Sequence, residues 1–183
     1  MDTNIVVILL LAAFVCAWAV WDVTRALRIS RQLRGDRVVT CPETGRPTAV
    51  TIDVRHAVAS GLVEHAPAIR LRTCSRWNER GRCDEPCIQE AAEPASTTRQ
   101  IVERALKGRA CAFCGKKIER AAFLDHYAAL LQPDLTTIEW PEVPPERLRE
   151  ALITHPPVCW DCHVAEAFRR QYPELVTDRP WRA

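Results

Sequence analysis

The N-terminal stretch of the chain is uniformly apolar. Residues 5–21 contain no charged side chain, and a helix over residues 3–21 is about 28 Å long, close to the thickness of a bilayer's hydrocarbon core. Arginines then recur every three residues from Arg25 to Arg37, and Gly35 is a favourable residue for ending a helix. The pattern predicts a transmembrane helix and a basic juxtamembrane helix within residues 1–35.

The body begins with patterns typical of β-structure. Residues 38–54 predict a β-hairpin, because β-branched segments flank turn-forming residues at 42–47. Residues 68–73 alternate between apolar and polar side chains and predict a third strand of a small antiparallel sheet. Residues 75–86 predict a loop, after which a helix can begin at Cys87 because Pro86 precedes it.

The remainder of the body predicts short helices and one short strand. Helical spacing of apolar side chains at 101–106 follows the capping candidates Thr97 and Thr98. The other predicted elements are a helical or mixed segment at 120–131, a strand at 136–140, and helices at 145–152 and 164–171. The predicted fold class is α+β, with the body divided into sub-modules at 36–93 and 94–183. Domains this small commonly need a metal or disulfides for stability.

Charge predicts the orientation of the apolar helix. No lysine or arginine precedes it, whereas five arginines follow within residues 22–37. This bias predicts the N-terminus outside and the body in the cytoplasm, at the inner membrane. A cleaved signal peptide is the alternative, with Ala17-Trp18-Ala19 as a weak cleavage site, although signal peptides usually begin with basic residues.

Two cysteine pairs carry the clearest chemical signal. Cys111 and Cys114, followed by Gly115, and Cys159 and Cys162 each have the two-residue spacing that lets a tight turn present two sulfurs to one metal. Two such turns give the tetrahedral thiolate site that Zn²⁺ accepts. Cytoplasmic thiols stay reduced, so the predicted orientation favours metal ligands over disulfides. Such a site has no open position, which favours a structural role over catalysis.

Four further cysteines precede these pairs. Cys41 and Cys74 follow predicted strands, and Cys83 and Cys87 lie four residues apart around a proline. We expect them to form a second zinc site. The alternative is that one or more of them are ordinary buried thiols, since free cysteine is often buried.

The downstream pairs resemble zinc-ribbon and rubredoxin-type knuckle proteins over about residues 109–165. The matching residues are Cys111, Cys114, Gly115, Lys116, Cys159 and Cys162. The interval between the pairs is longer than in a ribbon, which implies an inserted helix, and His163 stands where a second glycine is expected. The chain also looks like a set of uncharacterised bacterial single-pass membrane proteins, through residues 41–45 and 157–163, a likeness that implies no activity.

Residues 159–163 also match the attachment motif of c-type haem. Covalent haem attachment occurs outside the cytoplasm, against the predicted orientation. Met1 is the one methionine, so His126 or His155 would have to supply the sixth ligand. Iron can also bind four thiolates. The alternative function is therefore a membrane-anchored electron carrier with iron or haem; a third hypothesis is a thiol switch that loses its metal under mild oxidation.

No catalytic residue is predicted, because no metalloprotease helix, Ser/His/Asp set or phosphate-binding glycine loop is recognised. The formal charge of +2 resides in the N-terminal arginines, so the neutral body does not predict nucleic-acid binding. We expect a non-enzymatic, membrane-anchored interaction or scaffold module. Zinc would hold its loops rigid while Trp77, Trp140 and Trp160 remain exposed for a protein partner.

Overall fold

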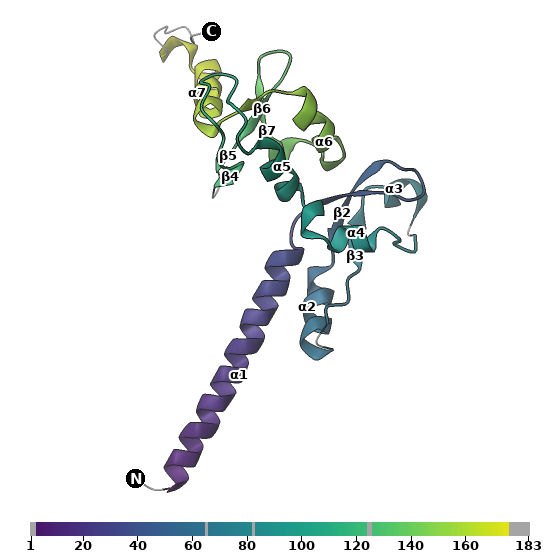
Figure 1. Cartoon of the computed structure of the whole chain (residues 1–183), viewed down its shortest axis with the longest axis vertical. Helices are drawn as coiled ribbons and strands as arrows, with labels where there is room; N and C mark the ends of the chain where they lie inside the picture. The colour runs from purple at the N-terminus through teal and green to yellow at the C-terminus, as the bar shows by residue number, and fades with distance from the viewer. Residues whose placement is uncertain (1–2, 65, 82, 124–125, 176–183) are drawn as a thin grey trace.

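The long N-terminal helix α1 (Thr3–Leu33) projects from a body of short strands and helices in the computed structural model (Figure 1). The structure describes residues 3–64, 66–81, 83–123 and 126–175. The amide of Arg34 still donates to the carbonyl of Ser30, and Gly35 then adopts a φ of 100°, which glycine tolerates better than other residues. The predicted end of the helix is confirmed.

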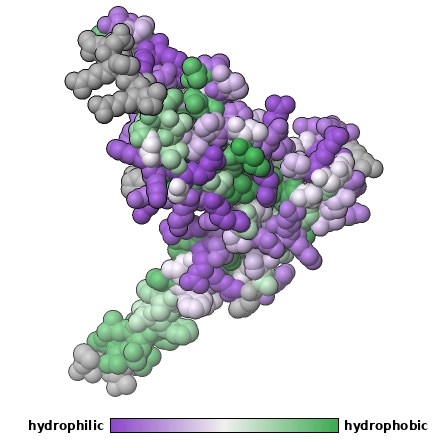
Figure 2. All heavy atoms as spheres, turned by 45° about the horizontal axis from the view of Figure 1, so that its top comes forward, coloured by the Kyte–Doolittle hydropathy of each residue, from purple (hydrophilic) through white to green (hydrophobic). Residues whose placement is uncertain are grey.

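By length and composition, α1 is able to cross a membrane, a property that it shares with signal sequences. None of its most apolar segment is buried within the structure. Figure 2 shows this apolar arm extending from a body whose visible face is largely hydrophilic. The predicted apolar helix is therefore present, while its insertion and orientation remain predictions.

The first part of the body contains the predicted antiparallel sheet. Its strands are β1 (Arg37–Thr40), β2 (Pro47–Ile52) and β3 (Leu71–Cys74), in the order β1-β2-β3. The hairpin register pairs Arg37 with Val50 and Thr40 with Pro47. Every second side chain of β2 is buried, so the alternation that predicted a strand also determines which of its faces lies in the core.

Two helices in this part were not predicted. α2 (Val54–Val63) begins after Asp53, whose carboxylate accepts a hydrogen bond of 3.0 Å from the amide of His56. The short α3 (Trp77–Arg80) lies inside the predicted loop at 75–86, which is wrong at that point. A predicted helix start at Cys87 is confirmed by α4 (Ile88–Ala92), which is followed by the 3-10 turn η1 (Pro94–Ser96).

α2 packs against the last turns of α1, as Figure 1 shows. Ile29 and Leu33 of α1 form a buried cluster with Ile52 and Ala57. A Cβ on Gly61 would lie 2.7 Å from the Cδ1 atom of Ile29, so this glycine permits the close approach of the two helices. The C-terminal end of α1 is therefore part of the core of the body.

Arg37 joins α1, the first sheet and the following turns. Its side chain is fully buried, and burial lowers its pKa from the ordinary value. The guanidinium donates to the carbonyls of Gln32 at 2.7 Å, Ala91 at 2.6 Å and Glu93 at 2.8 Å, and to the Ser96 hydroxyl at 3.2 Å. Because a buried cation needs such acceptors, these contacts fix α4 and η1 against the start of β1.

The second part combines three helices with short antiparallel strands. The elements are α5 (Thr98–Leu106), β4 (Ala122–Phe123), β5 (His126–Tyr127), β6 (Ala129–Leu131), β7 (Thr137–Glu139), η2 (Trp140–Glu142), α6 (Pro145–Thr154), β8 (Pro157–Val158), α7 (Trp160–Gln171) and η3 (Pro173–Leu175). β6 lies between β7 and β8. The predictions of α5, β7 and α6 are confirmed.

The predicted helical or mixed segment at 120–131 is wrong in its helical part, because the described residues there form strands. Ala128, Ala129 and Leu130 are consecutive and buried. A short buried apolar run has no periodicity that separates a central strand from a buried helix. Residues 129–131 form a strand because they pair with β7 and β8, and β8 lies far along the chain, where a local pattern gives no information about it.

The main core lies between α5, α6 and the strands. Val38 of β1 belongs to the same cluster as Leu106, Leu130 and Leu148, so the first sheet contacts the second part of the body. Trp140, predicted to be exposed, is only 8% exposed and its Nε1 atom donates to the Ala121 carbonyl at 3.3 Å. That prediction is wrong, because η2 turns the indole into this core. The division of the body between residues 93 and 94 stays a prediction.

Candidate metal site

Cys111 and Cys114 lie on a tight turn, as predicted. The Cys111 amide donates to the Lys116 carbonyl at 2.9 Å, and the Gly115 amide donates to the Cys111 carbonyl at 2.9 Å. Gly115 has a φ of 71°, in the left-handed region that glycine adopts without steric strain. The turn therefore reverses directly after the second cysteine of the pair.

Cys159 and Cys162 lie at the junction of a strand and a helix, so the expectation of a second knuckle turn is wrong. β8 ends at Val158, Cys159 is the N-cap residue of α7, and Cys162 lies in the first turn of that helix. His163 continues the helix at the position where a glycine would reverse the chain. The positive end of the helix dipole favours negatively charged sulfur here.

Two hydrogen bonds bring the pairs together. The Ala112 amide donates to the Pro157 carbonyl at 2.8 Å, which attaches the knuckle turn to β8. The Cys159 amide donates to the Sγ atom of Cys111 at 3.3 Å. β8 is itself held in place by β6, where Val158 pairs with Ala129. The sheet therefore supplies the long-range contact that the interval between the pairs requires.

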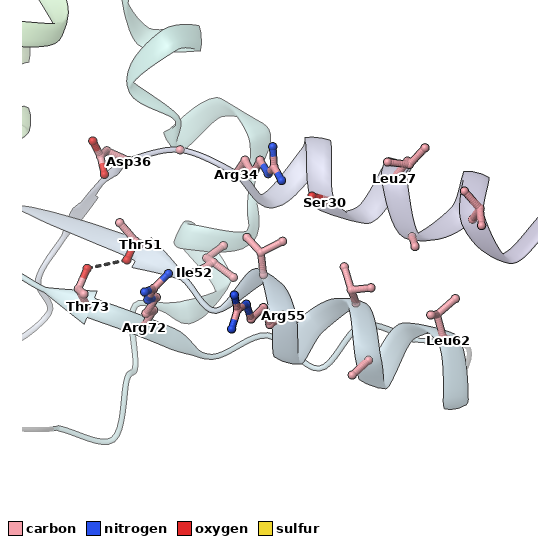
Figure 3. A pocket seen from close by; sticks show the side chains of 16 residues that line it. Leu27, Ser30, Arg34, Asp36, Thr51, Ile52, Arg55, Leu62, Arg72 and Thr73 are labelled. Carbon is pink, nitrogen blue, oxygen red and sulfur yellow. Dashed lines mark hydrogen bonds between the residues drawn. The ribbon is translucent and has the colours of Figure 1, made fainter.

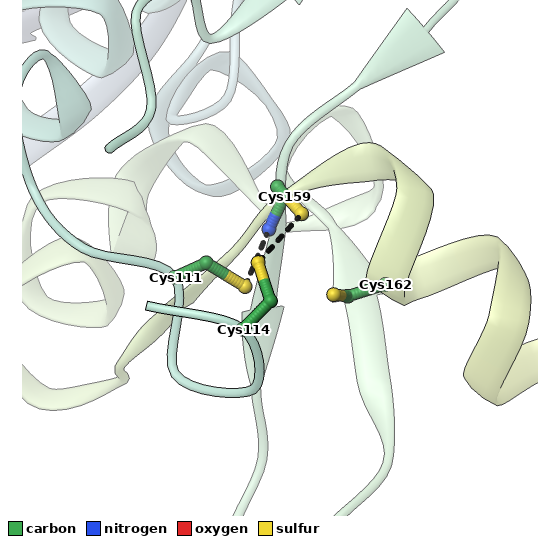
Figure 4. A group of neighbouring side chains, drawn as sticks. All are labelled: Cys111, Cys114, Cys159 and Cys162. Atoms are coloured by element: carbon green, nitrogen blue, oxygen red, sulfur yellow. Dashed lines mark hydrogen bonds between the residues drawn. The ribbon is translucent and has the colours of Figure 1, made fainter. Parts of the chain in front are cut away.

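The four sulfur atoms all lie within 4.8 Å of one another (Figure 4). Those of Cys114 and Cys159 are 3.8 Å apart. A tetrahedron of Zn–S bonds of about 2.3 Å has edges of about 3.8 Å, whereas a disulfide bond is about 2.05 Å long. The four cysteines are free thiols in the structure. The predicted convergence of these four cysteines is confirmed, and their spacing suits a tetrahedral cation.

The thiols of the cluster differ in acidity. Burial raises the pKa of Cys162, and hydrogen bonds with Cys159 and Cys114 raise it further. Burial also acts on Cys111, but amide hydrogen bonds from Cys114, Cys159 and Phe113 outweigh it and lower the pKa to about 7. Cys111 is therefore the thiol that ionises first, and its negative charge raises the pKa of Cys159 and Cys162. A bound dication removes this opposition, since metal ligation deprotonates thiols.

His163 faces β7. Its Nδ1 atom lies 2.7 Å from the Thr137 hydroxyl, and its Nε2 atom lies 3.5 Å from a carboxylate oxygen of Glu139. These contacts give His163 a hydrogen-bonding role between α7 and β7. A c-type haem needs this imidazole as an iron ligand and needs space around Cys159 and Cys162 for the porphyrin. The sulfurs of the other pair fill that space, so the residues do not fit haem.

His126 and two of the tryptophans have structural contacts. The rings of His126 and Trp160 stack, with centroids 3.8 Å apart and an interplanar angle of 18°. Trp160 and Trp77 are half-buried, and Trp77 packs beside a cluster that contains Val39 and Leu71. Asp125, the neighbour of His126, lies outside the described residues. The tryptophans therefore do not form the exposed surface that was predicted.

The four upstream cysteines line one cavity. Cys41, Cys74, Cys83 and Cys87 all border a cavity of ≈ 370 Å³ that is also lined by residues of the β1–β2 turn. Burial raises the pKa of Cys87, and the charges of the other three thiols raise it further. Among the described residues, only the downstream quartet brings its ligand atoms within 4.8 Å. The upstream cysteines thus converge without reaching coordinating distance.

The turn at Cys41 repeats the geometry of the turn at Cys111. The Cys41 amide donates to the Arg46 carbonyl at 2.9 Å, and the Gly45 amide donates to the Cys41 carbonyl at 2.8 Å. Gly45 has a φ of 65°. Thr44 occupies the position that Cys114 has in the other turn. This repeated turn was not recognised from the sequence. In both places a cysteine is followed four residues later by a glycine and then by a basic residue.

No family model, curated protein or solved structure matches this chain. The likeness to zinc-knuckle proteins therefore depends on the knuckle turn and on the distances between four sulfur atoms. It extends to the geometry of the site and not to an activity.

Replacing Cys162 with serine tests whether the cluster binds a metal that stabilises the fold. Structural zinc contributes about 10–16 kcal/mol of binding free energy, so loss of one ligand in four should lower the free energy of unfolding by about 3 kcal/mol. Thermal and urea unfolding of the full chain in detergent, followed by circular dichroism, measures this change.

Cys16→Ser, which removes a thiol of α1 far from the cluster, is the control and should unfold like the wild type. Excess chelator should bring the wild type to the stability of the Cys162 variant. Equal stability of Cys162→Ser and wild type in the presence of zinc would contradict a structural metal site.

Proposed function

We propose that this chain is a membrane-anchored, zinc-binding scaffold module with its body in the cytoplasm. The observation that carries the proposal is the cluster of four sulfur atoms, which links a knuckle turn to the start of α7. Zinc accepts four thiolates in tetrahedral geometry without preference from its d electrons. Iron accepts the same donors, and it is the alternative that the metal analysis below distinguishes.

The role of the metal in this proposal is structural. Cys111, Cys114, Cys159 and Cys162 would complete the coordination of one ion, whereas catalytic zinc sites keep a position for water. Zinc would add a metal cross-link between the knuckle turn and the start of α7, two segments that are already joined by hydrogen bonds from the Ala112 and Cys159 amides. The effect is a rigid second part of the body with no reaction assigned to it.

We further propose a second zinc site at the four upstream cysteines. The knuckle-type turn supports it, because amides of Glu43 and Thr44 point at the Cys41 sulfur in the way that amides point at Cys111. Burial raises the pKa of Cys41, but the Thr44 hydroxyl, these two amides and Arg76 outweigh burial and lower it.

Arg76 is the strongest sign that negative charge belongs in this cavity. Its Nη1 atom lies 2.8 Å from the Cys41 sulfur and 3.5 Å from a carboxylate oxygen of Glu43. Four thiolates and one Zn²⁺ sum to a charge of −2, half of which a guanidinium beside the site would offset. Cys74 ends β3 and Cys87 precedes α4, so both come from elements that the sheet positions. Closing the site requires the four sulfur atoms to move closer together around the ion.

The anchor in the proposal is α1. Arginines follow its apolar segment and none precedes it, which favours the cytoplasm for the body. The same helix enters the core through Ile29 and Leu33, so the anchor and the body are one rigid unit at this junction.

An exposed apolar stripe on α7 supports the interaction role. Val164 and Phe168 of α7 and its C-cap residue Tyr172 recur every four residues and are 42%, 46% and 38% exposed. The rings of Phe168 and Tyr172 lie 5.1 Å apart. α7 lies at the end of the molecule opposite the apolar arm (Figure 1). We propose that a protein partner packs on this stripe, in place of the tryptophan surface predicted from the sequence.

Elemental analysis of the full chain, purified in detergent under reducing conditions, tests both metal sites. We expect two zinc ions per chain and no visible absorbance. Cys74→Ser/Cys87→Ser and Cys159→Ser/Cys162→Ser should each lose one ion. If the wild type binds one zinc ion and the upstream variant still binds one, the proposed upstream site is contradicted and the downstream site is not. Iron with visible absorbance would favour the electron carrier.

Reporter fusions at the C-terminus test the orientation. In a bacterial host, a fluorescent protein should be active and alkaline phosphatase inactive, because the arginines hold the body in the cytoplasm. Replacing Arg25, Arg28 and Arg31 with glutamate should weaken this preference. Intact mass spectrometry of the mature chain is the control for cleavage. Active phosphatase, or a chain that has lost its first residues, would contradict the proposed anchor.

A photo-crosslinking amino acid at Phe168 tests the partner surface. We expect a discrete adduct with another protein in cells, because this side chain is apolar and exposed. Arg170 is the matched control position, two residues along and about 200° around the same helix. Val164→Lys should abolish the adduct at 168. Equal adducts from both positions would indicate random collision and would contradict a defined docking surface.

A further inference from the structure

A groove runs between α1 and α2. Its volume is ≈ 1080 Å³, and Figure 3 shows the two helices on either side of it. One end is apolar, lined by Val23 and Leu27 of α1 and by Val58 and Leu62 of α2. Leu27 is 50% exposed although it lies beside the body. The groove therefore leaves apolar surface uncovered where two helices diverge.

The opposite end of the groove is cationic. Arg34 just after α1, Arg55 of α2 and Arg72 of β3 line it, together with the single acidic side chain of Asp36 (Figure 3). Within the described residues, the guanidinium groups of these three arginines make no hydrogen bond or ion pair. Three cations against one carboxylate leave a net charge of +2 beside the apolar surface. An occupant of matching chemistry has an anionic head and an apolar tail.

The position of the groove on α1 indicates where such a molecule comes from. Val23 lies two residues after Trp21, the last residue of the uncharged segment, so the apolar end of the groove adjoins the proposed membrane span. Arg55 and Leu62 are seven residues apart on α2, which places the cationic end about 10 Å further from the membrane. That distance is the length of a glycerol backbone with the first part of an acyl chain.

We propose that this groove binds one anionic phospholipid of the membrane that holds α1. Arg55 and Arg72 bind its phosphate, and the upper part of one acyl chain lies between Leu27 and Leu62. The proposal rests on the proposed anchor. Guanidinium groups bind phosphate through charge-assisted hydrogen bonds, and bound anionic lipid would fix the body at the membrane surface.

Native mass spectrometry of the full chain released from lipid nanodiscs tests the proposal. The discs contain phosphatidylcholine with a minority of phosphatidylglycerol. We expect one phosphatidylglycerol retained per chain in the wild type. Arg55→Gln/Arg72→Gln should reduce the retained fraction at least about tenfold, equivalent to about 1.4 kcal/mol. Ala59→Trp, which fills the groove without changing charge, should reduce retention similarly.

The matched control is Arg28→Gln/Arg31→Gln. It removes the same charge from α1, outside this groove and no further from the membrane, and should retain the lipid like the wild type. Equal loss in both double variants would show general attraction to anionic membranes and would overturn the proposal. Retention of soluble glycerol phosphate in place of phosphatidylglycerol would overturn the lipid proposal and assign the groove to a free anion. Release of two associated chains with no bound lipid would overturn it and assign the groove to a second copy of the chain.

The two proposals fail differently in this experiment. A chain that does not enter the discs contradicts the anchor and this inference together. A chain that enters the discs and releases phosphatidylglycerol as readily as phosphatidylcholine contradicts the lipid site and leaves the anchor standing. Circular dichroism of each variant, compared with the wild type, establishes that the fold is unchanged.

Discussion

The proximity of four sulfur atoms is the constraint on which the second half of the body depends. Two of them are buried, with exposures of 3% at Cys111 and 5% at Cys162, and all four lie within 4.8 Å. As thiolates they repel one another, and as thiols they make only weak hydrogen bonds. A tetrahedral dication turns this repulsion into attraction. The short strands and helices around the cluster are small enough that such a cross-link matters to their stability.

In the first part of the body, hydrogen bonds of a buried arginine, not a metal cluster, connect α1 to the sheet and the following turns. Arg37 is buried, and backbone carbonyls and the Ser96 hydroxyl accept hydrogen bonds from its guanidinium group. The same region contains a knuckle-type turn with one cysteine in place of two, and Arg76 contacts its sulfur. The two halves therefore share one local turn and differ in how the surrounding charge is balanced. If both bind zinc, each half has its own cross-link, and Val38 of β1 joins them through the common core.

Local patterns predicted the parts of the structure that short-range physics determines. The apolar run predicted α1 and its end at Gly35, β-branched alternation predicted the hairpin, and cysteine spacing predicted the downstream cluster. α2 was missed although Asp53 caps it, because the preceding strand pattern was extended to residue 54. β6 was assigned wrongly because its pairing with β8 is a long-range contact. The junction at Cys159 was read as a turn because spacing alone does not distinguish a knuckle from a helix start.

Zinc K-edge X-ray absorption of the full chain in a membrane mimetic measures which atoms surround the bound metal. We expect four sulfur neighbours per zinc ion at about 2.3 Å and no nitrogen or oxygen shell. The spectrum should be the same whether one or both quartets are occupied, since all eight ligands are thiolates. A mixed shell with nitrogen or oxygen ligands at about 2.0–2.1 Å, or a folded chain that binds no metal, would contradict the proposed zinc sites.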